Sequence, residues 1–380
     1  MACSGGRIAE SSKARARRGT LLQDEDYRVL LEQRSVGDIA VELKKTSYSS
    51  VLQNFSLETM HRTELEFLLF AAILEEGLAF RWYMRSEDRE ILELWFQCFD
   101  IELFRNHFHF QMKTEEWEQS DVAELFRLSP SFRLTLIDRE KLFASTTPAD
   151  LLAAIKKETL RLALEEILPA GGGTGDQVEE GLAFQRMEFS GGMILDRYYF
   201  STLYAASRKL AGVEGRMMQL LTGTRVDLMN LYWIYRSRRF FNMRPEEALT
   251  LIMKARYRAD FDLLTKAAFA EPGAFASVLK ETRYGQVFDA GGREGAMREV
   301  QIEKNICRFL LEMANRVFLS GSLGFQNVAA YLMLKEFEVR DLITIIEAVR
   351  YGFERKGMDA LLIHRLSDEA SYAPAGKEVN

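Results

Sequence analysis

Apolar residues recur at helical spacing along most of the chain. Near the C-terminal end, Val339, Leu342, Ile343 and Ile346 follow an i, i+3, i+4, i+7 pattern, which places all four on one helix face. Alternation of β-branched and polar residues between turn residues, which is typical of strands, is rare. The pattern therefore predicts an all-α fold.

Prolines and glycines mark where these helices begin and end. Residues 147–150 (TPAD) and 244–247 (RPEE) each place a proline at the first helical position with acidic residues in the first turn. Both segments predict helix starts. The glycine-rich stretch 169–181 (PAGGGTGDQVEEG) is the strongest loop candidate, and 289–295 (DAGGREG) is the second.

One short sequence occurs more than once. Residues 43–51 read LKKTSYSSV and residues 279–287 read LKETRYGQV, so leucine, lysine, threonine, tyrosine and valine recur at the same places. A fainter third copy is IKKET at 155–159. Repeats at fixed spacing indicate a repeated supersecondary unit.

A second repeated element is related by a shift of 111 residues. The shift carries Asp227, Asn230 and Arg239 onto Glu338, Asp341 and Arg350, together with the apolar positions between them. Asp100 would begin the first copy at a shift of 127, but Leu103 and His109 stand where the other copies have polar groups. That copy has drifted or is misaligned.

These repeats predict three similar helical bundles of roughly 115 residues each, arranged with approximate threefold symmetry or in a row. The predicted domains are a disordered basic tail at 1–19, helical repeats at 20–130, 131–255 and 256–365, and a disordered tail at 366–380, with a flexible loop at 169–181 inside the second repeat.

Composition limits the classes of function. Fifty basic and 56 acidic residues give a net charge of −6, which offers no general attraction to nucleic acid or anionic lipid. The longest apolar run, 67–74, is far shorter than the roughly 18 residues of a membrane-spanning helix. The three cysteines fit neither a disulfide framework nor a CxxC metal site. We expect a soluble protein of a reducing cytoplasm, with no lipid insertion and no nucleic-acid partner.

Catalytic and metal-binding motifs are not evident. The histidines are His61, His107, His109 and His364, and Glu58 with His61 makes a single ExxH where a di-iron bundle needs two. The run 171–175 (GGGTG) lacks the Gly-Lys-Ser/Thr ending of a phosphate loop. We therefore expect no enzyme activity, cofactor, metal or small-molecule substrate, although an all-α enzyme with a dispersed site remains an alternative.

The repeated polar residues allow two interpretations. One helical turn brings Asp227 beside Asn230, and likewise Glu338 beside Asp341. These groups either pair with neighbouring helices inside each bundle, with Arg239 and Arg350 as candidate partners, or face a common cavity or partner.

Three stretches resemble one known family. Residues 227–236 (DLMNLYWIYR) followed by RFF at 239–241, residues 330–341 (AYLMLKEFEVRD) followed by RYG at 350–352, and LDRYYF at 195–200 are similar to the C/d (AC39) subunit family of V-type ATPases. The resemblance runs from about residue 27 to about residue 352. Asp341 stands where an asparagine is usual in that family.

The resemblance implies a funnel of three helical bundles that joins the rotor shaft of the catalytic part to the proteolipid ring, at the cytoplasmic face of the membrane. A protein in this position links ATP hydrolysis or synthesis to proton or sodium transport and is itself not catalytic. The recurring polar positions become candidates for the cavity wall or for the helices that form it: Asp227, Asn230, Arg236, Glu338, Arg340, Asp341 and Arg350. The alternative is an unrelated soluble helical-repeat scaffold.

Overall fold

A computed structural model describes residues 2–58, 60–113, 135–166, 177–271, 273–293, 295–353, 358 and 361–367. The predicted all-α fold is confirmed: over these residues the secondary structure is helical, without a named strand, and one isolated antiparallel bridge joins Ile137 and Ile155. The long helices are α1 (Ala2–Arg18), α5 (Arg62–Leu78), α6 (Ser86–Lys113), α11 (Gln177–Ser207), α12 (Gly212–Arg239), α16 (Gly295–Phe318) and α17 (Phe325–Arg350). None of these helices, over its described residues, is both long and apolar enough to cross a membrane.

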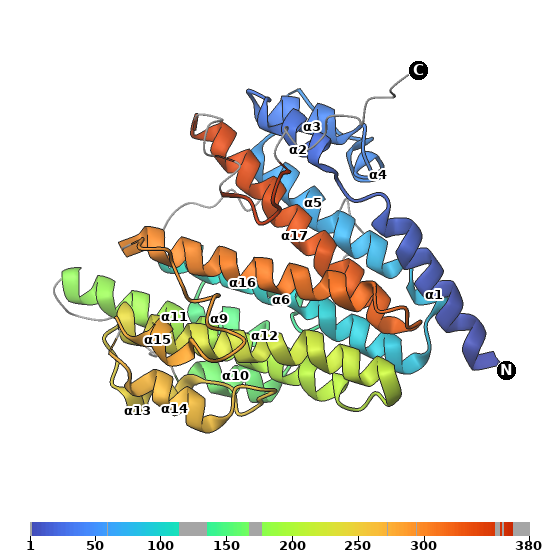
Figure 1. The fold of residues 1–380 in the computed structure, drawn as a ribbon. Coiled ribbons are helices and arrows are strands. Elements are labelled where there is room, and N and C mark those ends of the chain that lie inside the picture. Colours follow the sequence, from blue (N-terminus) through green and yellow to red (C-terminus); the bar gives the residue numbers. More distant parts are fainter. Residues whose placement is uncertain are drawn as a thin grey trace, which may run out of the picture.

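The long helices pack in a continuous series. Helix α6 lies against α11, α11 against α12, α12 against both α16 and α17, and α17 against α5. In Figure 1, α16, α6, α11 and α12 run across the molecule while α17 and α5 cross them obliquely. Their buried apolar side chains form one connected core. The predicted funnel of three separate bundles stays a prediction.

Short helices cover this series in three groups. The groups are α2 (Asp24–Leu31), α3 (Val36–Leu43) and α4 (Ser49–Leu52); α8 (Arg139–Ala144), α9 (Pro148–Ala153) and α10 (Glu158–Glu165); and α13 (Pro245–Leu251), α14 (Phe261–Phe269) and α15 (Phe275–Leu279). In the first group, α2 and α3 pack on α17, and α3 and α4 pack on α5; the second group packs on α6 and α11, and the third on α12. The N-terminal copy of the repeat therefore contacts the last long helix, α17, as well as α5.

The prediction of a disordered tail at residues 1–19 was wrong for residues 2–18. Residues 2–18 form α1, which packs along α17 and against the 3₁₀ helix η1 (Arg81–Tyr83). Ser11 and Ala14 are fully buried on one face, and Lys13 donates to the Ala79 carbonyl. The basic composition suggested a solvated segment, but the small residues on one face allow close packing, which overrides composition.

Other predicted boundaries have mixed outcomes. Helices α9 and α13 begin at Pro148 and Pro245, as predicted. Of the predicted loop 289–295, residues 289–293 are confirmed, with left-handed backbone at Gly291 and Gly292; residue 294 lies outside the described residues, and Gly295 already begins α16. Of the predicted loop 169–181, residues up to 176 lie outside the described residues, and 177–181 already belong to α11, so that part was wrong. Of the tail 366–380, residues 368–380 lie outside the described residues, and the domain boundaries stay predictions.

Candidate functional site

Asp227, on α12, is fully buried and holds a crossing segment of backbone. Its carboxylate accepts the N–H groups of Tyr257, Arg258 and Ala259 at 2.9, 2.7 and 2.9 Å. The hydroxyl of Tyr284 also donates to it at 2.7 Å. Four donors satisfy the charge that burial would otherwise penalise. Asp227 is therefore an internal structural anchor.

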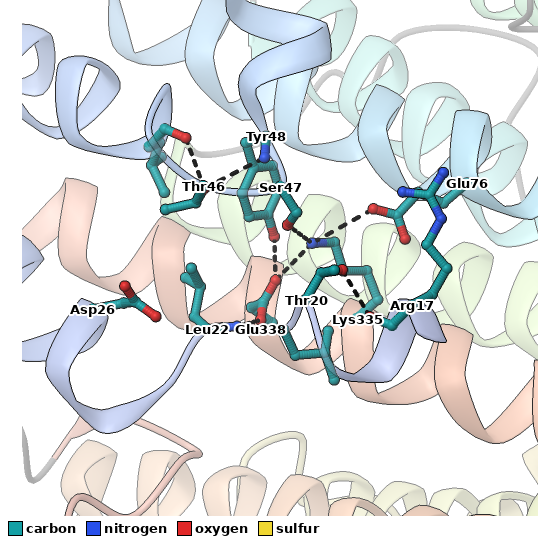
Figure 2. Close-up of polar contacts among 12 residues, drawn as sticks. Arg17, Thr20, Leu22, Asp26, Thr46, Ser47, Tyr48, Glu76, Lys335 and Glu338 are labelled. Atoms are coloured by element: carbon teal, nitrogen blue, oxygen red, sulfur yellow. Dashed lines mark hydrogen bonds and ion pairs between the residues drawn. The ribbon is translucent and has the colours of Figure 1, made fainter. Parts of the chain in front are cut away.

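Glu338, at the equivalent position on α17, binds Leu22 and Tyr48, which follow α1 in the chain. The N–H of Leu22 donates to its Oε2 at 2.5 Å, and the hydroxyl of Tyr48 donates to its Oε1 at 2.8 Å. Figure 2 shows Lys335 beside it, with Nζ 2.7 Å from Oε1 of Glu338 and 3.8 Å from Glu76. Lys335 is fully buried and its ammonium also lies 3.8 Å from the centre of the Tyr48 ring. This ion-paired cluster ties α5, α17 and the segment before α4 together.

Asp100, on α6, plays the same part in the first copy. It is buried and accepts the N–H of Leu136 at 2.6 Å. Burial raises the pKa of Asp100 to about 7, against the lowering effect of that N–H. The alignment at a shift of 127 is thus supported at this residue despite its poor match elsewhere. We call Asp100, Asp227 and Glu338 the anchor carboxylates.

Asn230 and Asp341 form a second equivalent pair, one helical turn beyond two of the anchor carboxylates. The Asn230 side chain accepts the N–H of Met253, 23 residues later, and donates to the carbonyls of Met253 and Ala255. Asp341 accepts the N–H of Ile363 at 2.6 Å and that of His364, again 23 residues later, at 2.9 Å. Burial raises the pKa of Asp341 to about 6.

The three predicted arginines differ from these buried groups because each is partly exposed. Arg236 pairs with Glu299 at 2.8 Å, and Arg340 pairs with Glu336 at 3.0 Å. Arg350 lies 4.0 Å from Glu347 and about half of its side chain is exposed. The seven predicted residues consequently divide into four core residues and three surface arginines, and each of the seven has its own partners. Whether they form a cavity wall stays a prediction.

A largely buried ion pair joins α12 and α17, and it was not predicted from the sequence. Arg225 donates to both carboxylate oxygens of Glu336, at 2.8 and 3.3 Å, and little of either side chain is exposed. The shift of 111 residues also carries Arg225 onto Glu336, so opposite charges stand at equivalent repeat positions. That exchange of sign is the signal that could have revealed the pair.

The histidines show no shared site among the described residues. His61 precedes α5, and burial lowers the pKa of His107, whose ring lies edge-on to Phe143. His364 stacks on Tyr27 and lies 2.6 Å from Asp24. The side chain of His109 lies outside the part of the chain that the structure describes. Among the described His, Cys, Asp and Glu side chains, the one group close enough to share a cation is Glu10, Asp88 and Glu214.

Helices held together by carboxylates at repeated positions define an internally repeated helical protein. The chain belongs to the ATP synthase (C/AC39) subunit family, whose sequence profile matches residues 11–361. It is 22% identical over 365 residues to the C subunit of the A-type ATP synthase of Methanobrevibacter smithii, covering 94% of this chain and 88% of that protein. It is 22% identical over 216 residues to the protein of the same name from Methanosphaera stadtmanae, covering 56% and 53%. The family resemblance seen in the sequence is confirmed.

Proposed function

We propose that this chain is the non-catalytic coupling subunit between the rotor shaft and the proteolipid ring of a V- or A-type ATP synthase, at the cytoplasmic face of the membrane. The match to the family over nearly the whole chain carries the proposal. In this role the protein transmits torque between the catalytic part and the ion-carrying ring, and needs neither a cofactor nor a small-molecule substrate.

The internal anchoring suits a part that transmits torque. Such a part must turn as one body, so segments distant in sequence have to be fixed to one another. The anchor carboxylates bind backbone N–H groups of separate segments, and Glu338 joins the backbone at Leu22 to the last long helix, α17. Charge-assisted hydrogen bonds of this kind are stronger than neutral ones and fix geometry as well as energy.

One end of the molecule carries apolar side chains suited to a protein partner. The connections before α6, α12 and α17 meet beside α1, where Arg85 and Arg7 pair with Glu214 and the N–H of Phe325 donates to it. We call this region, with α1, the hairpin end; it lies near the N-terminus in Figure 1. Its exposed apolar residues are Ile8, Trp82, Tyr83, Val213, Leu319 and Leu323. Such a gathering is typical of a contact surface, and we assign it to the ring.

Affinity purification of the tagged full-length chain from detergent-solubilised native membranes, followed by mass spectrometry, tests the proposal. We expect shaft and ring subunits to be recovered together. The double variant Trp82→Ser, Leu319→Ser should lose ring subunits and keep the shaft, whereas Phe269→Ser, which alters an exposed apolar residue of α14, should keep both.

Two outcomes contradict different parts of the proposal. Recovery of the chain alone, where the intact rotary complex is demonstrably present, would refute the coupling role. Recovery of ring subunits by the double variant at the level of the unaltered chain would leave the coupling role standing and refute the assignment of the hairpin end.

A further inference from the structure

Three acidic side chains from different helices meet under α1. Glu10 comes from α1, Asp88 from the start of α6 and Glu214 from the start of α12. All three are buried, with relative exposures of 1%, 0% and 5%. One carboxylate oxygen from each lies within 4.8 Å of the others. Negative charges this close in a buried setting require compensation.

Two arginines supply part of that compensation. Arg85 donates to both oxygens of Asp88, at 2.7 and 2.8 Å, and to Glu214 Oε2 at 2.8 Å. Arg7 donates to the same Glu214 oxygen at 2.9 Å. With all three carboxyl groups ionised, three negative charges face two positive ones. One negative charge remains uncompensated.

Glu10 is the group that the arginines leave without a donor. Neither of its carboxylate oxygens has a hydrogen-bond partner among the described residues, although the side chain is almost completely buried. Buried carboxylates are normally paired, and leaving one unpaired costs far more than leaving a neutral group unpaired. The position therefore calls for a positive species that none of the described side chains supplies.

A neutral amide oxygen near Glu214 also lacks a hydrogen-bond donor within the described part of the chain. Oε1 of Gln326, on α17, is buried and has no donor among the described residues. A Cβ atom placed on Gly324 would lie 2.7 Å from this oxygen and 2.7 Å from Glu214 Oε1, so both oxygens crowd one small space. Carboxylate and amide oxygens without nearby thiols or imidazoles are the ligands of hard cations.

We propose that Glu10, Asp88 and Glu214 bind a hard cation of single charge, such as Na⁺ or K⁺, with Gln326 Oε1 as a neighbouring oxygen ligand. The single charge follows from the balance of three carboxylates against Arg7 and Arg85. The ion joins α1 to the starts of α6 and α12. It thereby holds the N-terminal helix across the hairpin end, independently of the proposed coupling role.

Thermal unfolding of the purified full-length chain tests the site. The chain is dialysed into choline chloride and titrated with NaCl, KCl or CaCl₂ at constant ionic strength. We expect Na⁺ or K⁺ to raise the unfolding midpoint saturably, by about 3 °C at a concentration near 100 times the Kd. Glu10→Gln should abolish this rise. Glu336→Gln, the same change at a largely buried carboxylate that arginines already pair, should retain it.

A direct binding measurement covers the case in which Glu10→Gln fails to fold. Line broadening of the ²³Na resonance by the unaltered chain, reversed by added K⁺, would support the site without any variant. Equal midpoints in choline, Na⁺ and K⁺ together with an unbroadened ²³Na line would overturn the proposal, because a proton on Glu10 would then supply the missing charge. Stabilisation by Ca²⁺ with none by Na⁺ or K⁺ would overturn the single-charge assignment.

Discussion

Tyr48 and Glu338 are 290 residues apart in sequence and are joined by a buried hydrogen bond of 2.8 Å. The same contact occurs between Tyr284 and Asp227, at 2.7 Å. Each tyrosine follows a threonine whose hydroxyl donates to a carbonyl three residues back and accepts the N–H of the tyrosine itself. The repeated tyrosine therefore donates a hydrogen bond to the repeated acid. In the unit of Tyr48 and Glu338, this contact joins the two ends of the chain.

Tyr48→Phe should destabilise the chain by about 1.5–3 kcal/mol, because it removes a hydrogen bond to a charged group and leaves the ring in place. The midpoint of urea unfolding, followed by circular dichroism, measures the loss. Tyr351→Phe is the matched control. Because Tyr351 is exposed, the free energy of unfolding of this variant should differ from that of the unaltered chain by less than about 0.5 kcal/mol. Equal midpoints for Tyr48→Phe and the control would show that the contact adds nothing.

Asp341 should give stability a specific pH dependence. Its folded-state pKa is raised by burial from 3.8 to about 6, so the folded chain binds this proton more tightly than the unfolded chain. The corresponding stability is present below about pH 4 and is lost as the pH rises through about 6.

Asp341→Asn removes that titration, so the stability of the variant relative to the unaltered chain should rise between about pH 4 and about pH 7. Urea unfolding of both proteins at several pH values checks this, and the comparison cancels groups common to both. A difference that stays constant across the range would contradict a raised pKa at Asp341.

The short repeat and the 111-residue shift predicted much of the internal geometry. Asp227 with Asn230, and Glu338 with Asp341, are equivalent in the structure, and both pairs bind crossing segments. Each of the four side chains has partners within the chain, and whether they also face a common cavity stays a prediction. The partners are chiefly backbone N–H groups, however, which no side-chain pattern reveals.

Two features depend on tertiary packing and could not be predicted from the sequence. The burial of α1 follows from contact with α17, because its own composition favours solvent. Residues 43–51 contact α17 through the bond between Tyr48 and Glu338, in addition to packing on α5, and this follows from how the two chain ends meet. Repeat spacing shows which segments are equivalent, but it does not show which long helix each segment covers.

Arg225 and Glu336 should be strongly coupled in a double-mutant cycle. Arg225→Leu leaves the Glu336 carboxylate with Arg340 alone, so we expect a loss of about 2–4 kcal/mol, somewhat below the cost of a fully orphaned buried charge. Arg225→Leu combined with Glu336→Leu should be less destabilised than the sum of the single variants, because no unpaired charge remains between α12 and α17. Additive losses in urea unfolding would mean that the two residues do not stabilise each other.

The composition of α1 favours a solvated tail, whereas its contacts in the structure hold it against α17 and α16. A solvated basic tail would exchange its amide hydrogens within seconds, whereas α1 is held by Ser11 against Gly324 and Asn327 and by Arg18 against Asn315. We expect amides of residues 8–18 to be protected to the same degree as the first turns of α17. Hydrogen exchange followed by mass spectrometry measures this directly.

Ser11→Asp should remove that protection selectively. The substitution places a carboxylate in a fully buried position beside the carbonyl of Gly324, so the bonds that hold α1 are lost and exchange over residues 8–18 should become fast. Protection in α12 and α16 should remain, since their contacts with each other do not involve α1. Ser12→Asp, one position along on the exposed face, is the matched control and should leave α1 protected. Fast exchange over residues 8–18 in the unaltered chain would show that the helix is not docked in solution.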